Sequence, residues 1–179
     1  MKLLKHLLLA ITLIVVATGT ASAQKGMSGI GVNLGFGLNQ DYIVYDFILL
    51  NNISLKYQYN FSNYYRIEPI ISYRYVLYAN TTYRISNFEI GINNHFFMTK
   101  AKRFRPYAIA GIGYMHMTEG YTDSKEIYKS SYAYFCGGFG LDYRFSHKWS
   151  GQASLSYTGS LGDYFNGFID LELGIAYNF

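Results

Sequence analysis

The sequence contains one cysteine, two prolines and few charged residues for a chain of 179 residues. A single cysteine excludes a small fold held together by disulfides. Charged residues make up 15% of the chain, against roughly 25% in typical soluble domains. The 20 tyrosines, 13 phenylalanines and 18 glycines exclude a disordered chain, and they favour strands over a helical bundle. The mean hydropathy of +0.03 nevertheless resembles that of a soluble protein, so apolar and polar residues must be finely mixed.

The most prominent continuous apolar run lies at the N-terminus. The run covers residues 7–17, follows two lysines and is followed by Ala-Ser-Ala at 21–23, which is the pattern of a secretory signal peptide. It is shorter than the roughly 20 residues that a membrane-spanning helix needs. We therefore expect a cleaved signal peptide over 1–23 and one exported domain over 24–179. Cleavage would remove basic residues and reduce the excess of 15 basic over 11 acidic residues, so we expect no nucleic-acid partner.

The remainder of the chain alternates between apolar and polar residues with a period of two, which indicates β-strands with two unlike faces. In the last such segment, the odd positions from 169 to 179 are all aliphatic or aromatic, and the even positions are small, polar or charged. No convincing helical period follows residue 24. Eight strands are predicted, over 27–38, 45–61, 64–78, 85–98, 104–116, 128–145, 149–157 and 168–179.

The facing of the fifth strand is ambiguous. Gly111 and Gly113 favour an inner face at the odd positions, whereas Tyr107 and Ile109 favour the reverse. A β-bulge within 104–116 would reconcile the two patterns, because a bulge shifts the alternation by one residue.

Short and long connections alternate along the chain. The short ones cover 62–63, 99–103 and 146–148, and the long ones cover 39–45, 79–84, 117–127 and 158–167. An even number of strands with this alternation is typical of outer-membrane barrels, whose short turns face the periplasm. The sequence thus predicts an all-β fold, an eight-stranded antiparallel up-and-down transmembrane β-barrel. A soluble lipocalin-like ligand-binding barrel is the alternative, because alternation alone does not tell which face points inward.

Aromatic residues on the apolar faces gather near the short turns and the C-terminus. They are Phe61, Tyr65, Phe96, Tyr143, Phe145, Trp149, Tyr177 and Phe179. We interpret them as a periplasmic aromatic girdle at the membrane interface. A soluble core has no need for aromatic residues at strand ends, so this placement favours the membrane barrel.

The C-terminal residues Glu172, Gly174, Tyr177 and Phe179 fit a polar-x-Gly-x-x-aromatic-x-aromatic pattern that ends in phenylalanine. With these residues, the sequence resembles the small eight-stranded outer-membrane β-barrel family of the OmpA and OmpX transmembrane-domain type over its mature length. The resemblance implies the outer membrane of a Gram-negative cell. It also implies delivery by periplasmic chaperones and recognition of this pattern as an assembly signal by the barrel-assembly machinery. We expect a monomer surrounded by outer-membrane lipid and lipopolysaccharide.

The polar faces of the predicted strands carry four cations and five anions, which nearly cancel. They are Lys56, Arg66, Glu68, Arg74, Glu89, Asp142, Arg144, Asp170 and Glu172. The interior of an eight-stranded barrel is just wide enough for side chains to fill it. Buried charges there should pair with one another, so we predict a lumen charge network and no porin-like channel.

The sequence offers weak support for an enzyme. Outer-membrane barrels that modify lipid A use a serine with a histidine and an acid, as in other acyl-transfer triads. His147 falls in a predicted periplasmic turn, away from the outer leaflet, and the H-x-S spacing of lipid A deacylases is absent. We expect His95 to fill the lumen and His116 to lie at the extracellular rim. The prediction is therefore a chain with no catalytic, cofactor-binding or metal site, with a lipid A deacylase or acyltransferase as the alternative.

Function is then expected to lie in the extracellular loops, which could contact a host surface, lipopolysaccharide or another envelope protein. The charged and aromatic loop residues are Glu119, Asp123, Lys125, Glu126, Asp163, Tyr164 and Phe165. At the opposite end, a basic group is predicted around one short turn, where it would meet anionic headgroups or periplasmic acids. It comprises Lys100, Lys102, Arg103 and Arg105. The predicted role is structural or surface-interacting, in adhesion or envelope integrity.

Overall fold

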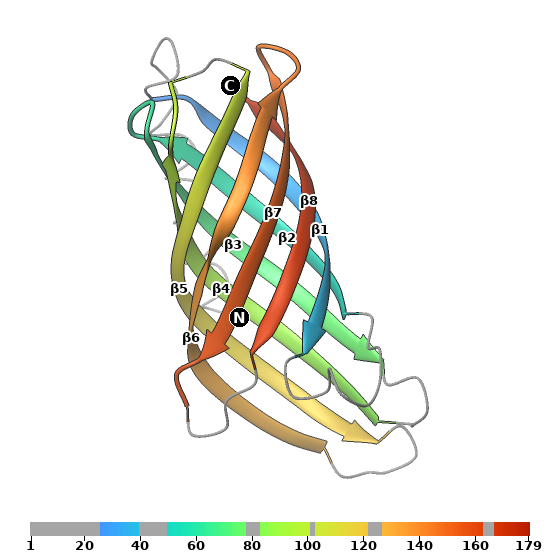
Figure 1. Ribbon diagram of the computed structural model, residues 1–179. Coiled ribbons are helices and arrows are strands. Elements are labelled where there is room, and N and C mark those ends of the chain that lie inside the picture. Colours follow the sequence, from blue (N-terminus) through green and yellow to red (C-terminus); the bar gives the residue numbers. More distant parts are fainter. Residues whose placement is uncertain (1–25, 40–49, 78–82, 101–102, 122–126, 163–166) are drawn as a thin grey trace, which may run out of the picture.

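The computed structural model describes residues 26–39, 50–77, 83–100, 103–121, 127–162 and 167–179. Eight antiparallel strands close into a barrel in which each strand pairs with its neighbours in the chain and β1 pairs with β8 (Figure 1). The strands are β1 (Ser28–Asn39), β2 (Leu50–Asn60), β3 (Tyr65–Leu77), β4 (Tyr83–Phe97), β5 (Phe104–Tyr121), β6 (Ile127–Arg144), β7 (Trp149–Ser160) and β8 (Phe168–Asn178). The predicted eight-stranded antiparallel barrel is confirmed. In the described residues, no helix is long and apolar enough to span a lipid bilayer.

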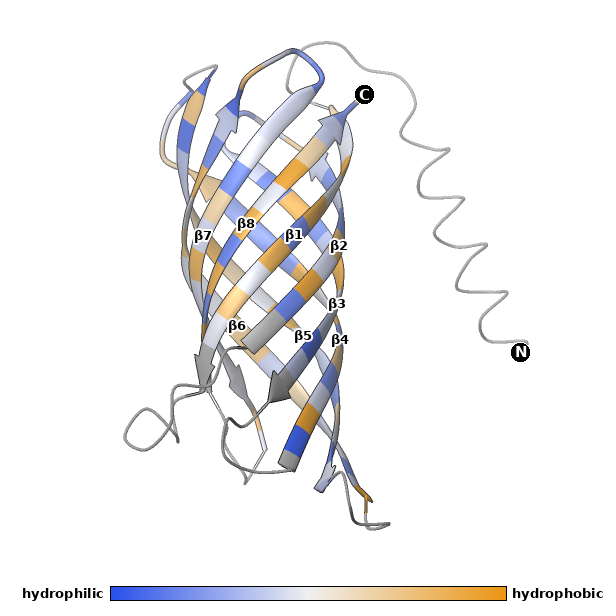
Figure 2. Ribbon diagram, turned by 90° about the vertical axis from the view of Figure 1, so that its right-hand side faces the viewer, coloured by the Kyte–Doolittle hydropathy of each residue, from blue (hydrophilic) through white to orange (hydrophobic). Residues whose placement is uncertain are grey.

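The two faces of the barrel wall are inverted relative to a soluble protein. Ile112 and Phe139 on the outer face are each 67% exposed, whereas Arg66 in the interior has no exposed surface. Figure 2 shows apolar and polar residues alternating along the strands. An apolar exterior is the arrangement of a barrel in lipid, so the soluble lipocalin-like alternative, with its apolar face inward, is wrong.

The ambiguous strand β5 has a single facing over its whole length. Its pairing with β6 runs without interruption from Phe104 to Gly120, so the bulge that the sequence suggested is wrong. Tyr107 and Ile109 point inward together with the two glycines. Tyr107 fits inside because it covers Gly140 of β6, where a Cβ atom would lie 2.6 Å from Cε2 of the tyrosine ring. A large inward residue is thus accommodated by the missing side chain of its neighbour.

Several strands extend further than the sequence predicted. Residues 117–121 belong to β5 and residues 158–160 to β7. The loops predicted over 117–127 and 158–167 are therefore shorter than the sequence suggested. Inward-facing Met115 and Met117 pack with Phe168 of β8, and this apolar contact holds the strands together beyond the polar lumen. The remaining loop positions 122–126 and 163–166, with Asp123, Lys125, Glu126, Asp163, Tyr164 and Phe165, lie outside the described residues. So does the expected signal peptide over 1–23.

Candidate functional site

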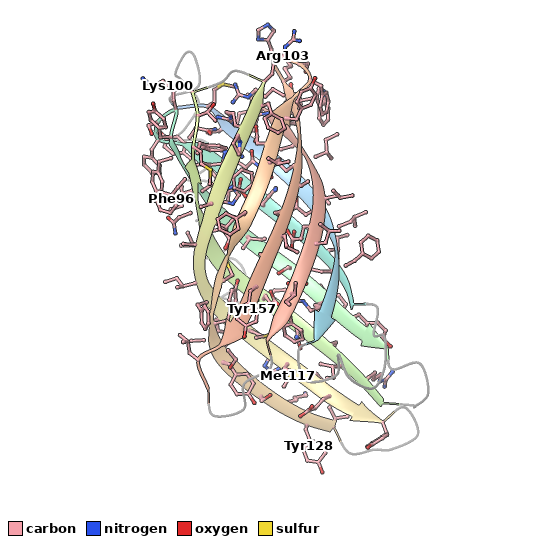
Figure 3. All side chains as sticks on the ribbon, in the orientation of Figure 1. Phe96, Lys100, Arg103, Met117, Tyr128 and Tyr157 are labelled. Carbon is pink, nitrogen blue, oxygen red and sulfur yellow. The ribbon has the colours of Figure 1, made fainter. Side chains whose placement is uncertain are left out.

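The barrel interior holds the polar residues of every strand, and its contents form layers. At the end with the short turns, charged side chains form a turn-side ion cluster, defined as Lys56, Arg66, Glu68, Arg105 and Asp142. In Figure 3, Lys100 and Arg103 mark this end, and Met117 and Tyr128 mark the opposite end.

Asp142 is the central acceptor of the turn-side ion cluster. Its Oδ2 lies 2.9 Å from Nη2 of Arg66, and its Oδ1 lies 3.0 Å from Nη2 of Arg105. Nε2 of Gln152 also donates to Oδ2, at 3.1 Å. A carboxylate on β6 therefore binds side chains from β3, β5 and β7. Both arginines and the aspartate are almost completely buried, where a charge without a partner would be costly.

Glu68 extends the same cluster toward β2 and β4. Its Oε1 lies 3.1 Å from Nη1 of Arg66, and its Oε2 lies 3.8 Å from Nζ of Lys56 and 3.4 Å from Nε2 of His95. Nζ of Lys56 also donates to the side-chain oxygen of Gln152. The cluster thus crosses the barrel rather than following one wall.

Aromatic rings fill the space beside these charges. Phe97 lies beneath two guanidinium groups, with ring-centroid distances of 4.8 Å to Arg66 and 4.1 Å to Arg105. The rings of His95 and Tyr107 are stacked, with centroids 4.4 Å apart. Cation–π contacts are strengthened when the cation is desolvated. The turn-side end of the lumen is therefore occupied by ion pairs and rings in contact.

A second group of charges, the loop-side ion cluster, comprises Arg74, Glu89 and Asp170. Nη2 of Arg74 lies 2.9 Å from Oδ2 of Asp170 and 3.5 Å from Oε1 of Glu89. The guanidinium also lies 4.4 Å from the ring centroid of Phe168. Phe168 in turn belongs to an apolar cluster that closes the loop side of the interior, together with Ile85, Met115, Met117 and Tyr134.

A space of about 40 Å³ lies between the two ion clusters and is lined by residues of both. A volume of this size holds a few water molecules at most. Glu172 also lines it and accepts hydrogen bonds from Asn33 (2.8 Å) and Asn52 (2.9 Å).

The structure therefore brings together seven of the nine charges predicted for the lumen, and it adds an eighth, Arg105. Glu172 points inward as predicted but binds asparagines rather than a cation. Arg144 is half-buried at the rim and forms no ion pair within the described residues. With Arg105 added, the set of nine predicted lumen charges becomes five cations and five carboxylates; Glu119, at the loop-side end of β5, is a further inward position.

The assignment of Arg105 to a basic group around the turn is wrong. Arg105 is 1% exposed and paired with Asp142, because it is the first odd position of the inward series of β5. Its place in the same alternation as Tyr107 was the signal that could have identified it. Of the other three basic residues, Lys100 lies over the Tyr64 ring at 5.4 Å, Arg103 is exposed, and Lys102 lies outside the described residues.

The residues predicted for the aromatic girdle lie on the outer face near the short turns, either exposed or half-buried. Two groups have rings in contact. One links Phe61, Tyr65 and Phe96, with successive centroid distances of 5.6 and 5.5 Å. The other links Trp149, Tyr177 and Phe179, with distances of 5.1 and 6.5 Å. Tyr143 and Phe145 are exposed on the same end of β6 and in the turn that follows it.

The four residues predicted as an assembly signal lie where the barrel closes. Glu172 and Gly174 line the inner face of β8 opposite β1. Tyr177 and Phe179 alternate with them on the outer face, and the backbone of Phe179 exchanges hydrogen bonds with Ser28 at 2.9 and 3.3 Å. The last strand is thus paired to its final residue.

The three histidines of the expected mature chain lie far apart in the fold. His95 is inside the turn-side end, and His147 lies in the turn between β6 and β7. His116 lies on the outer wall, with Nδ1 2.9 Å from Oγ of Ser131. No carboxylate contacts this pair within the described part of the chain. The same residues contain no group of three or more His, Cys, Asp or Glu side chains that could hold a metal ion.

Residues 7–179 match the model of a family described as the outer membrane protein beta-barrel domain. This chain belongs to that family. The barrel is therefore an outer-membrane protein, as the resemblance implied. No curated protein sequence matches the chain.

Solved structures of small outer-membrane barrels are similar in fold. Neisserial surface protein A is 12% identical, with 86% of this chain and 96% of that chain covered at a TM-score of 0.61. OprG from Pseudomonas aeruginosa is 14% identical, with coverages of 88% and 98% and a TM-score of 0.60. The attachment invasion locus protein Ail of Yersinia pestis, solved with the heparin analogue sucrose octasulfate, is 16% identical, with coverages of 86% and 97% and a TM-score of 0.55. At these identities the likeness is one of fold.

Proposed function

We propose that this outer-membrane barrel has a structural or surface-interaction role and a lumen closed by its own side chains. The observation that carries the proposal is the layered interior, in which two ion clusters and an apolar cluster leave a space of only about 40 Å³ between the ion clusters. A continuous water path would require buried ion pairs to separate, and leaving a buried charge without its partner is strongly unfavourable. An eight-stranded barrel is also too narrow to hold both these side chains and a channel.

The first prediction concerns conductance. The purified, folded protein should give no stable, large single-channel openings in a planar lipid bilayer, because the paired side chains of the two ion clusters occupy the lumen. Single-channel recording tests this, with a porin as positive control and heat-modifiable gel mobility to show that the protein is folded. Reproducible large openings would contradict the closed lumen.

We further propose the route by which the barrel reaches the membrane. Export by a signal peptide cleaved before Gln24 is supported by the pattern over 1–23. Recognition by periplasmic chaperones and the barrel-assembly machinery is supported by the outward rings of Tyr177 and Phe179 at the end of the paired β8, of which Phe179 is exposed. The monomeric state is supported by the closed strand order, which leaves no sheet edge to pair with a second copy.

The loops that join the strands at the loop-side end are proposed to contact a host surface or envelope component, and the barrel is proposed not to be an enzyme. The structure of Ail with a sulfated sugar provides an example of a polyanionic ligand on a barrel of this fold. Against an enzyme, no carboxylate in the described part of the chain contacts the His116–Ser131 pair to orient the base as in acyl-transfer triads.

A deletion strain tests both parts. Loss of the gene should reduce adhesion or resistance to detergent, and complementation with a variant shortened at 122–126 and 163–166 should restore the barrel but not adhesion. The acyl chains of lipid A, measured by mass spectrometry, should be the same with and without the protein. Unchanged adhesion after loop shortening would refute the interaction role, and a changed acyl pattern would revive the lipid-modifying enzyme.

A further inference from the structure

Strands β3 to β6 continue past the apolar band on the loop side, and in Figure 1 strands β4, β5 and β6 reach furthest there. The outer face of the wall can be read in rows from the strand register. Ile90 pairs with Tyr114, and both are exposed and apolar or aromatic in character. The next row joins Tyr73, Phe88, His116 and Ser131. The apolar band therefore ends at this row.

Polar and cationic residues begin in this row and continue in the two rows that follow, which also hold Tyr75, Gly120 and Ile127. We call them the outer polar patch, defined as Arg84, Ser86, His116, Thr118, Lys129 and Ser131. Arg84 and Lys129 are exposed. None of these six outward positions is a carboxylate, and Glu119, an inward position of β5, is the one carboxylate among the described residues that line the groove over the patch. The patch therefore presents positive charge and hydroxyl groups at the loop-side edge of the apolar band.

A groove of about 200 Å³ crosses this patch. It is lined by Tyr73 and Tyr75 of β3, by Arg84 and Ser86 of β4, and by Thr118, Glu119, Gly120, Tyr121 and Ile127. Lys129 is paired with Thr118, which also lines the groove. The Cα atoms of Arg84 and Lys129 lie two strands and two residues apart, or about 12 Å at the usual strand spacings. The long side chains of both residues can reach a ligand that lies across Thr118.

We propose that the outer polar patch binds the phosphorylated sugar headgroup of an outer-leaflet glycolipid. Guanidinium and ammonium groups form charge-assisted hydrogen bonds with phosphate. The hydroxyls of Ser86 and Thr118 suit the hydroxyls of a sugar, and the tyrosines offer it an amphipathic surface. The acyl chains would extend from the patch toward the turn side, over Phe88 and Ile90, which are 50% and 39% exposed. This proposal rests on the proposed orientation, with short turns in the periplasm.

The composition of the groove distinguishes this ligand from a simpler anion. Free phosphate would use only the two cations, and the headgroup of a phospholipid would leave the hydroxyl and tyrosine surface without partners. A ligand that carries phosphate, sugar and acyl chains together matches all three kinds of surface in the order in which they occur along β4.

Binding of diphosphorylated lipid A to the delipidated, detergent-purified full chain tests the proposal by native mass spectrometry. The variant R84Q/K129Q should bind at least about tenfold more weakly, since each charged hydrogen bond lost is worth that factor. The matched control is K100Q, which removes an exposed cation over the Tyr64 ring at the opposite end. This control should bind within about twofold of the unchanged protein. Heat-modifiable gel mobility verifies that each variant is folded.

Three further probes identify the chemistry. Dephosphorylated lipid A and phosphatidylglycerol should both bind at least about tenfold more weakly than diphosphorylated lipid A, and inorganic phosphate should not compete at equal concentration. Equal binding by R84Q/K129Q, equal binding of phosphatidylglycerol, or displacement by inorganic phosphate would each overturn the proposal. Conductance and adhesion do not enter this measurement, so its failure is distinguishable from failure of the proposed function.

Discussion

Replacing Asp142 by asparagine is expected to lower the free energy of unfolding by about 3–5 kcal/mol, the cost of removing one partner from a buried ion pair. The substitution preserves the shape of the side chain but removes the charge that faces Arg66 and Arg105 at 2.9 and 3.0 Å. Arg66 would retain Glu68, whereas the described residues offer Arg105 no second carboxylate. Most of the lost stability should therefore come from leaving the buried charge of Arg105 without a partner.

Unfolding by urea in lipid vesicles measures this effect. Trp149, the single tryptophan, lies on the outer face and reports the transition by fluorescence. Glu119→Gln likewise turns a carboxylate into an amide, but on a partly exposed side chain at the end of β5 far from Arg105. It should lower the free energy of unfolding by about 1 kcal/mol or less. Adding Arg105→Gln to Asp142→Asn should restore part of the stability, because the unpaired charge is removed. Equal stability of D142N and the unchanged protein would show that the turn-side ion cluster does not hold the barrel together.

Replacing Gly140 by alanine is expected to cost about 1–3 kcal/mol through overpacking. The added Cβ would lie 2.6 Å from Cε2 of Tyr107. That ring is held between His95 and Phe97, with centroids at 4.4 and 5.5 Å, so it has little room to move. Gly140→Val should be more destabilising again, because the branched side chain is larger.

Gly137→Ala is the matched control on the same strand. Its Cβ would meet nothing nearer than the carbonyl oxygen of Ile109 at 3.9 Å, so the change should be neutral or slightly stabilising through the unfolded chain. Replacing Tyr107 by leucine in the G140A background should recover part of the loss. Equal unfolding midpoints for G140A and G137A would contradict the close packing of Tyr107 on β6.

These two sites also show why the polar interior could be predicted only in part. The inward facing of Asp142 and Gly140 follows from alternation within β6 alone. Their partners lie on other strands. Which residues become partners depends on the strand register, which cannot be predicted from the residues of one strand alone. Arg105 shows both parts: its alternation with Tyr107 indicates the inward face, but near a turn it resembles the exposed basic residues beside it, and its pair with Asp142 depends on strand register.

The alternating faces, the eight strands, the short and long connections and the family can be recognised in the sequence, because each depends on residues that are near one another in the chain. The facing of β5, the full lengths of β5 and β7, the separation of the charges into two clusters and the outer polar patch became visible in the folded barrel. Each of these depends on which residues of neighbouring strands lie side by side. A tyrosine can point inward where the next strand supplies a glycine, and a charge can be buried where closure of the barrel supplies its counter-ion.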